Sequence, residues 1–170
     1  MHTRDHPQTE DNITIRVFDA ADAPTAAAAA TAEPKEEYRT HNATRTAYHS
    51  EVIAGLAGEA GPDIEVDVLA LGDSTAATAD LGDDQPLGNE VYRDAVTDRA
   101  ASGQTLNVTL FIDATEANGL AFEEAALVAE TPTGDLPINR FLIDDPGGLL
   151  SPKSRNETVT INIEIQQQDA

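Results

Sequence analysis

Three segments of the chain alternate between apolar and polar residues. They read "IEVDVLAL" (64–71), "TLNVTLFI" (105–112) and "TVTINIEI" (158–165). Successive side chains of a β-strand point to opposite faces of a sheet, so a period of two predicts strands with one buried face. Acidic chains without such a pattern are commonly intrinsically disordered. The three segments therefore predict a folded, strand-rich protein over most of the length.

Other segments complete this pattern. Strands are predicted over 13–18, 121–129 and 137–144, and the segment 90–101 fits either a strand or a helix. Turn signals such as Asn118-Gly119 separate the strands. We therefore expect a mainly β fold, an antiparallel β-sandwich with one early helix and an extended N-terminal arm. In two of the strands, the residues expected to share the buried face are Ile64, Val66, Val68 and Ala70, and Leu106, Val108, Leu110 and Ile112.

The N-terminal third predicts a helix and a linker. Residues 36–56 carry an apolar stripe at helical spacing, and glycines end it. The Ala-rich stretch between Pro24 and Pro34 fits a marginal helix or a linker equally well. We expect two parts: an N-terminal arm with its Ala-rich linker (1–34), and a β-sandwich domain with a leading helix (35–170). Such an arm could add an edge strand to a neighbouring subunit.

The charge of the chain narrows its partners and its surroundings. There are 31 acidic residues against 10 basic ones, a formal net charge of −21, and only Lys35 and Lys153 are lysines. Molar salt screens such repulsion, with a Debye length of about 3 Å at 1 M, which favours a protein that works in brine. Nucleic acid is not an expected partner, because phosphate binding requires clustered Lys and Arg. Membrane insertion is not expected either, since no apolar run is long enough to span a bilayer.

The chain has no cysteine, so neither disulfides nor thiolate metal sites are expected. The start "MHTRDHPQTEDN" lacks the apolar core of a secretory leader, and we expect synthesis in the cytoplasm.

The sequence contains few candidates for catalytic or metal-binding residues. Asp73, Asp80, Asp83 and Asp84 are weak candidates for a cation site, but they lack regular ligand spacing and a solvated loop explains them better. The pairs His2–His6 and His41–His49 do not predict a metal site. No serine lies in a nucleophile motif and no glycine-rich loop has the phosphate-binding pattern. We expect neither an enzyme nor a cofactor. Glycosylation sequons begin at Asn12, Asn42, Asn107 and Asn156.

Four stretches then follow in order: "HNATRTAYHSEVIAGLAG" (41–58), "LALGDSTAATADLGDDQPLGNEVYRDAV" (69–96), "SGQTLNVTLFIDATEANGLAFEEAALV" (102–128) and "SPKSRNETVTINIEI" (151–165). This series resembles the tail-fibre and baseplate-associated structural proteins of tailed viruses. The chain departs from the family pattern in having "GDS" for "GTG" and "EEAAL" for "REVGL". Acidic residues also replace neutral surface residues, as a version from a virus of halophilic archaea would require.

The resemblance implies a set of structural residues: Gly72, Leu87, Gly88, Asn89, Glu90, Tyr92, Arg93, Glu116, Asn118 and Gly119. Within this set, Gly88-Asn89 is expected to form a turn. Glu90 and Arg93 are expected to form an ion pair that fixes the loop, with Glu116 as a further candidate partner. Tyr92 and Leu87 are expected to pack beneath that turn.

The resemblance also implies a function. We expect a virion protein that acts at the tail tip, baseplate or tail-fibre attachment site, in assembly and host attachment. Its partners would be other tail proteins and copies of itself, with a trimer as the expected oligomer. Host-surface glycan or an S-layer is a further candidate partner. The alternatives are a capsid decoration or turret protein and a glycan-binding module that uses loops at one end of the sandwich.

Overall fold

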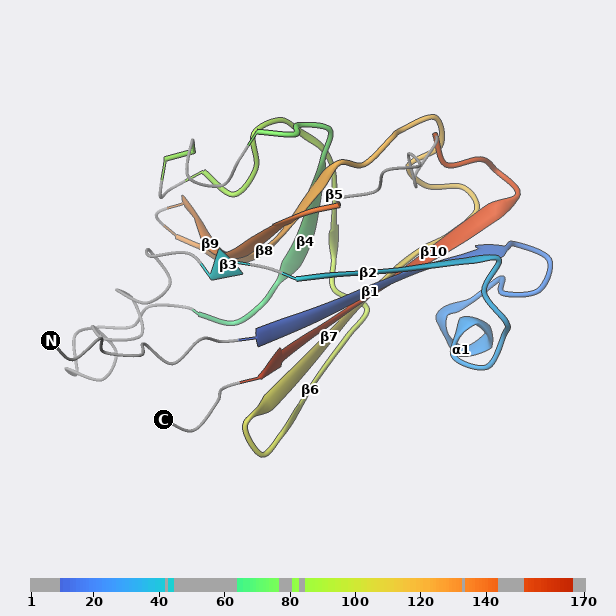
Figure 1. Cartoon of the computed structure of the whole chain (residues 1–170), viewed down its shortest axis with the longest axis horizontal. Coiled ribbons are helices and arrows are strands. Elements are labelled where there is room, and N and C mark those ends of the chain that lie inside the picture. Colours follow the sequence, from blue (N-terminus) through green and yellow to red (C-terminus); the bar gives the residue numbers. More distant parts are fainter. Residues whose placement is uncertain are drawn as a thin grey trace, which may run out of the picture.

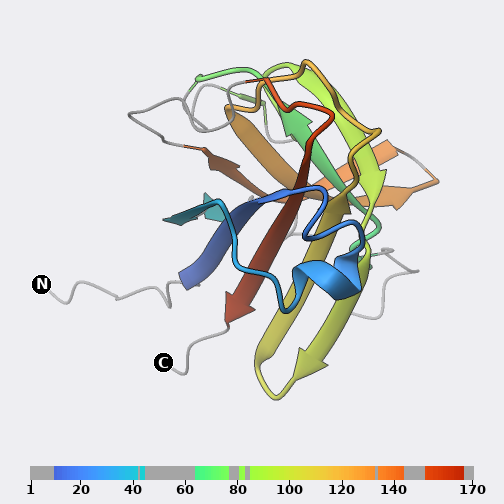
Figure 2. The ribbon, with the colours of Figure 1, turned by 90° about the vertical axis from the view of Figure 1, so that its right-hand side faces the viewer.

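The computed structural model describes residues 10–41, 43–44, 64–76, 81–82, 85–132, 134–143 and 152–166. Within them the fold is a β-sandwich of two antiparallel five-stranded sheets, which confirms the expected fold class (Figures 1 and 2). The strands are β1 (Glu10–Asp19), β2 (Glu36–His41), β3 (Ala43–Thr44), β4 (Val68–Gly72), β5 (Glu90–Ala95), β6 (Asp98–Ser102), β7 (Thr105–Ile112), β8 (Glu124–Thr131), β9 (Gly134–Leu142) and β10 (Glu157–Gln166). No described helix is long and apolar enough to cross a membrane.

Sheet A has the strand order β2-β1-β10-β7-β6. Its two longest strands, β1 and β10, pair without interruption from Glu10 opposite Gln166 to Asp19 opposite Glu157. Alternation fixes which face of these strands is buried, because slipping the register by one residue would expose every apolar side chain. Ile13, Ile161 and Leu110, on three neighbouring strands, accordingly face the interior.

Sheet B has the strand order β3-β9-β8-β4-β5. Its central strands are buried on both faces, so β8 reads "EAALVAET" with six buried residues in a row. Leu69 and Leu71 of β4 pack into the core between the sheets, whereas Val68 and Ala70 face outward into a second apolar cluster that contains Leu87. The sequence prediction that Ile64, Val66, Val68 and Ala70 share one buried face is therefore wrong. Val66 belongs to the core between the sheets, Val68 and Ala70 belong to the outward-facing cluster, and Ile64 is exposed. The alternation ends before β4, whose residues "VLALG" are apolar throughout and buried, so the sequence cannot reveal which side of this strand meets the other sheet.

The helix predicted over 36–56 is also wrong where the structure describes it. Residues Glu36–His41 form the edge strand β2, paired with β1. Ala43 and Thr44 form the short strand β3, paired with β9, and the rest of that prediction, residues 42 and 45–56, lies outside the described residues. The one helix in the described ranges is α1 (Ala26–Ala29), inside the Ala-rich stretch, where the Thr25 hydroxyl accepts a hydrogen bond from the Ala28 amide. The high alanine content and the N-cap residue Thr25 thus allow a short helix to form although Pro24 and Pro34 lie on either side of it.

The predicted N-terminal arm is not seen in the described residues. β1 lies inside sheet A between β2 and β10, and Ile13 and Ile15 are almost completely buried. α1 then packs back on the same sheet, where Ala23 and Ala29 contact Phe18. The division at residue 34 therefore does not separate two structural units, because β1 supplies core residues to the sandwich. Residues 1–9 lie outside the described ranges.

Candidate functional site

The turn at 86–89 is held from below by a buried carboxylate. Glu124, at the start of β8, is completely buried, and its side chain accepts two backbone hydrogen bonds. The Gly88 amide donates to Oε2 at 3.0 Å, and the Asn89 amide donates to Oε1 at 2.9 Å. One side chain therefore fixes two successive peptide groups at the entry to β5.

Arg140 balances the charge of Glu124. It lies on β9, and its side chain is as completely buried as that of Glu124. Nε donates to Glu124 Oε2 at 2.8 Å, and Nη2 donates both to the same oxygen and to the Ala76 carbonyl oxygen at 2.8 Å. A buried charge is tolerated when it is paired and its hydrogen bonds are satisfied. The pair thus binds the loop that follows β4 as well as the turn that precedes β5.

Two glycines let the backbone come close to this pair. A Cβ at Gly72 would lie 2.4 Å from Glu124 Oε1 and 2.6 Å from the Asn89 carbonyl oxygen. A Cβ at Gly88 would lie 2.5 Å from Ser74 Oγ. Among the described glycines, positive φ angles occur at Gly103, Gly119 and Gly134. Gly88 is therefore required for close approach rather than for a left-handed turn. We call Gly72, Gly88, Asn89, Glu124 and Arg140 the Glu124 clamp.

The ion pair expected within the motif is present, but its further partners differ from the expectation. Arg93 donates to both carboxylate oxygens of Glu90 at 2.8 Å. It also pairs with Asp135 at 2.6 Å and with Glu130 at 3.3 Å. Glu116, the further candidate, instead accepts a hydrogen bond from the Asp113 amide. The Arg93 guanidinium thus joins β5 to the hairpin between β8 and β9.

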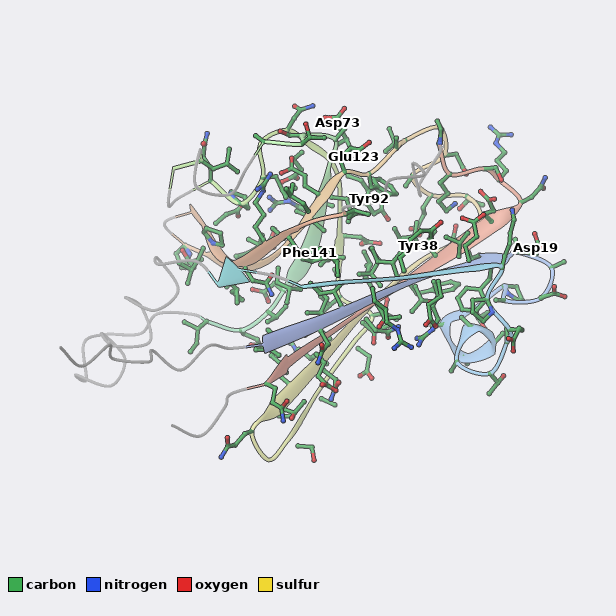
Figure 3. The ribbon with its side chains drawn as sticks, viewed as in Figure 1. Asp19, Tyr38, Asp73, Tyr92, Glu123 and Phe141 are labelled. Atoms are coloured by element: carbon green, nitrogen blue, oxygen red, sulfur yellow. The ribbon has the colours of Figure 1, made fainter. Side chains whose placement is uncertain are left out.

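Leu87 and Tyr92 were expected to pack together beneath the turn, and the structure places them on opposite faces of sheet B. Leu87 belongs to the outward-facing apolar cluster. Tyr92 packs against the core between the sheets, with its ring centroid 6.5 Å from that of Phe122. Its hydroxyl donates to Asp94, and burial raises the pKa of that hydroxyl. Figure 3 shows Tyr92 on the same upper side of the molecule as Asp73 and Glu123.

The "TEANG" loop is held by the second lysine of the chain. The buried Lys153 ammonium donates to the Glu116 carbonyl oxygen at 2.9 Å and to Asn118 Oδ1 at 3.3 Å. Gly119 and Leu120 exchange backbone hydrogen bonds with Lys153 as well. Burial lowers the pKa of Lys153. The long connection before β10 is thereby tied to the loop between β7 and β8, which the motif order alone does not reveal.

Glu157 forms a further link, and its titration gives a prediction. Its carboxylate accepts from Lys35 Nζ at 2.7 Å and from the Ser154 amide at 2.9 Å, and the Lys35 hydrogen bond is the main cause that lowers its pKa. A lowered folded-state pKa adds stability above the unfolded pKa of about 4.3, and this contribution is lost as the pH falls through the folded-state value. In molar salt, Glu157→Gln should therefore destabilise the protein at neutral pH and progressively less in acid.

Urea unfolding of wild type and Glu157→Gln, from neutral pH to well below the unfolded pKa, measures the difference in the free energy of unfolding. Glu33→Gln is the control, because the exposed Glu33 carboxylate makes no hydrogen bond or ion pair within the part of the chain that the structure describes. A gap between wild type and Glu157→Gln that stays constant from neutral pH to well below the unfolded pKa would contradict the prediction.

The weak cation candidates do not form a site within the described residues. Asp73 Oδ1 accepts a hydrogen bond from Asn89 Nδ2 at 2.6 Å. Asp80, Asp83 and Asp84 lie outside the described ranges, as do the side chains of the four histidines. The described residues contain no cluster of three or more potential ligands. The sequon residues Asn12, Asn107 and Asn156 are exposed, and Asn42 lies outside the description.

Glu124 and Arg140 are the main residues that sequence reasoning missed. The signal that could have found them is the presence of charged residues, Glu123-Glu124 and Arg140, in the strongly apolar segments "AFEEAALV" and "PINRFLI". A charge in a buried strand generally requires a partner. Comparison with known proteins adds nothing to this geometry, because no family model, curated protein or solved structure matches the chain.

Proposed function

We propose that this chain is a structural protein of the virion of a tailed virus of halophilic archaea. It would act at the tail tip, baseplate or tail-fibre attachment site, with other tail proteins and copies of itself as partners. The observation that supports this most is the Glu124 clamp. It uses a buried ion pair and two glycines to hold the "LGNE" turn, which is the motif that carries the resemblance.

The residues of the motif are engaged with one another. Glu124 binds two backbone amides, Arg93 binds three carboxylates, and Lys153 binds the "TEANG" loop. Charged side chains that are held in hydrogen bonds and ion pairs in this way make the fold rigid, and they are poorly placed to act as a nucleophile or to carry a proton. A rigid sandwich with fixed turns is suited to repeated docking between subunits.

The open edge of sheet A supports an assembly role. Among the described strands β6 pairs only with β7, and all five of its residues are exposed. Figure 2 shows the β6–β7 hairpin extending away from sheet B. β6 reads "DRAAS" and contains neither Pro nor Lys, two residues that commonly protect an edge. Arg99 is paired with Glu65 and Asp67, so the uncharged part of this edge is Ala100 to Ser102. Two chains with net charge −21 can approach most easily at such an uncharged segment. Since β1 is used in its own sheet, β6 is the strand we propose for docking a second copy.

A substitution at this edge tests the assembly role. Ala100→Lys should lower the mass of the oligomer that the purified protein forms in molar salt, because a charged side chain at an edge opposes strand addition. Light scattering or sedimentation measures that mass. Ala27→Lys is the matched control, since it makes the same exchange at an exposed position of the short helix α1, where no strand can be added. A wild-type chain that is strictly monomeric in brine, or an oligomer that both variants leave intact, would contradict docking through β6.

The location in the particle is tested separately. Antibody raised against the chain should label the tail tip of purified virions. Label on the capsid would favour the decoration or turret alternative, and virions without label would overturn the virion assignment altogether.

A further inference from the structure

The outer face of sheet A carries a hollow of about 200 Å³. Three neighbouring strands, β1, β10 and β7, form its floor. The polar side chains that line it are mostly amides and hydroxyls: Asn12, Thr14, Asn107, Thr109, Asn162 and Glu164. The face is covered at one end by the α1 segment, which packs on Phe18, so the hollow occupies the remaining part of the sheet.

Strand register brings these side chains into rows. Thr14 lies opposite Asn162, which lies opposite Thr109. In the next row Asn12 lies opposite Glu164, which lies opposite Asn107. The Thr109 hydroxyl donates to Asn162 Oδ1 at 3.0 Å, and this bond orients the Asn162 amide. Within the part of the chain that the structure describes, no hydrogen bond engages the side chains of Thr14 or Asn107, so their polar atoms face the hollow unused.

The third row, Arg16, Thr160 and Phe111, lies toward the α1 end of the face. Of these residues only Arg16 lines the hollow. Thr160 is only 9% exposed, and the half-buried Phe111 packs against the cluster of Phe18, Ala23 and Ala29. The hollow therefore ends at this row.

The charge of the hollow differs from that of the chain as a whole. The protein has 31 acidic residues, but the lining contains one carboxylate, Glu164, and one guanidinium, Arg16. Arg16 is also paired with Glu37 at 2.8 Å. A nearly neutral face of amides and hydroxyls selects a partner that donates and accepts hydrogen bonds without carrying charge.

We propose that this hollow binds a neutral oligosaccharide. Sugar hydroxyls both donate and accept, as the Asn amide groups and Thr hydroxyls of the lining do in return. An acidic sugar fits less well, because the one guanidinium of the lining, Arg16, is already paired with Glu37 and no other cation among the described residues lines the hollow. A second copy of the chain is a poorer occupant, because two hollow faces placed together leave a void between them.

Titration of the isotope-labelled chain by nuclear magnetic resonance in molar salt tests the proposal. The probes are chitotriose, which is neutral and carries amides, maltotriose, which is neutral without amides, and trigalacturonic acid, which is charged. Chitotriose is expected to shift the side-chain amide signals of Asn12, Asn107 and Asn162, with weaker effects from maltotriose and none from the acidic trimer. Shifts that are absent with both neutral sugars, or strongest with the acidic trimer, would overturn it.

Variants separate binding at the hollow from binding elsewhere. Asn162→Leu and the nearly isosteric Thr14→Val should each weaken chitotriose binding by about tenfold, the equivalent of one or two hydrogen bonds. Thr75→Val, at an exposed position in the loop after β4 of sheet B, should leave it unchanged. Thr14→Val removes one hydroxyl with little change of volume, so it remains informative if Asn162→Leu fails to fold. Equal affinity in all three variants, or signals that shift with protein concentration alone, would overturn the proposal, the latter in favour of self-association.

Discussion

Glu124→Ala should destabilise the protein by about 3–5 kcal/mol, because it removes the carboxylate from a completely buried ion pair and leaves the Arg140 charge without that partner. Arg140 would keep its bond to the Ala76 carbonyl oxygen but lose both bonds to the carboxylate. The amides of Gly88 and Asn89 would lose their acceptor as well. The measurement is the free energy of unfolding in urea at molar salt, with the refolding branch checked for reversibility.

Two further variants identify the cause. Glu124→Gln keeps the shape of the side chain and removes its charge, so it should also be strongly destabilising. In the double variant Glu124→Gln/Arg140→Met no buried charge remains, and part of the loss should be recovered. A loss below about 1 kcal/mol for Glu124→Ala would mean that the pair is not sealed from water as the geometry requires.

Gly72→Ala should destabilise the protein by about 1–3 kcal/mol, the usual cost of inserting a methyl group into a closely packed site. The new Cβ would lie 2.6 Å from the Asn89 carbonyl oxygen, which is backbone and cannot rotate away. It would also lie 2.4 Å from Glu124 Oε1. The expected result is a lower unfolding midpoint in urea, together with loss of protection of the Gly88 and Asn89 amides from hydrogen exchange.

Gly103→Ala is the comparison for this variant. Gly103 has φ +62°, and a methyl group there would meet no atom within 4 Å. Alanine at this position should therefore cost only the left-handed backbone penalty of about 1–2 kcal/mol. The protection of the Gly88 and Asn89 amides should remain as in the wild type. If Gly72→Ala costs as much in a Glu124→Ala background as in the wild type, contact with the carboxylate is not the cause.

The sequence predicts the sandwich because alternation is a local property. The sequences of β7 and β10 alternate, and the buried residues of β7 lie on the expected face, as Val108 and Leu110 show. β4 fails because both of its faces are buried, and covering of the second face depends on a distant loop that contains Leu87. β2 fails for a similar reason, since pairing with β1 overrides the helical spacing of the segment that contains it.

The candidate site is predicted only in part because its determinants are distant in sequence. The Glu90–Arg93 pair spans three residues and could be inferred from local order. Glu124 acts on peptide groups 35 and 36 residues away, and Arg140 lies on the next strand. Neither contact follows from spacing, because it depends on which strands become neighbours. Motif resemblance located the turn but not the carboxylate that supports it.

The pairing of Glu10 with Gln166 has a practical consequence for engineering. Because the first and last described strands end side by side, a short peptide could join them into a closed ring. The ring could then be reopened at the exposed tip between Ser102 and Thr105 without cutting any other strand. Such a circularly permuted chain would separate the folding of the sandwich from the order in which its strands are synthesised.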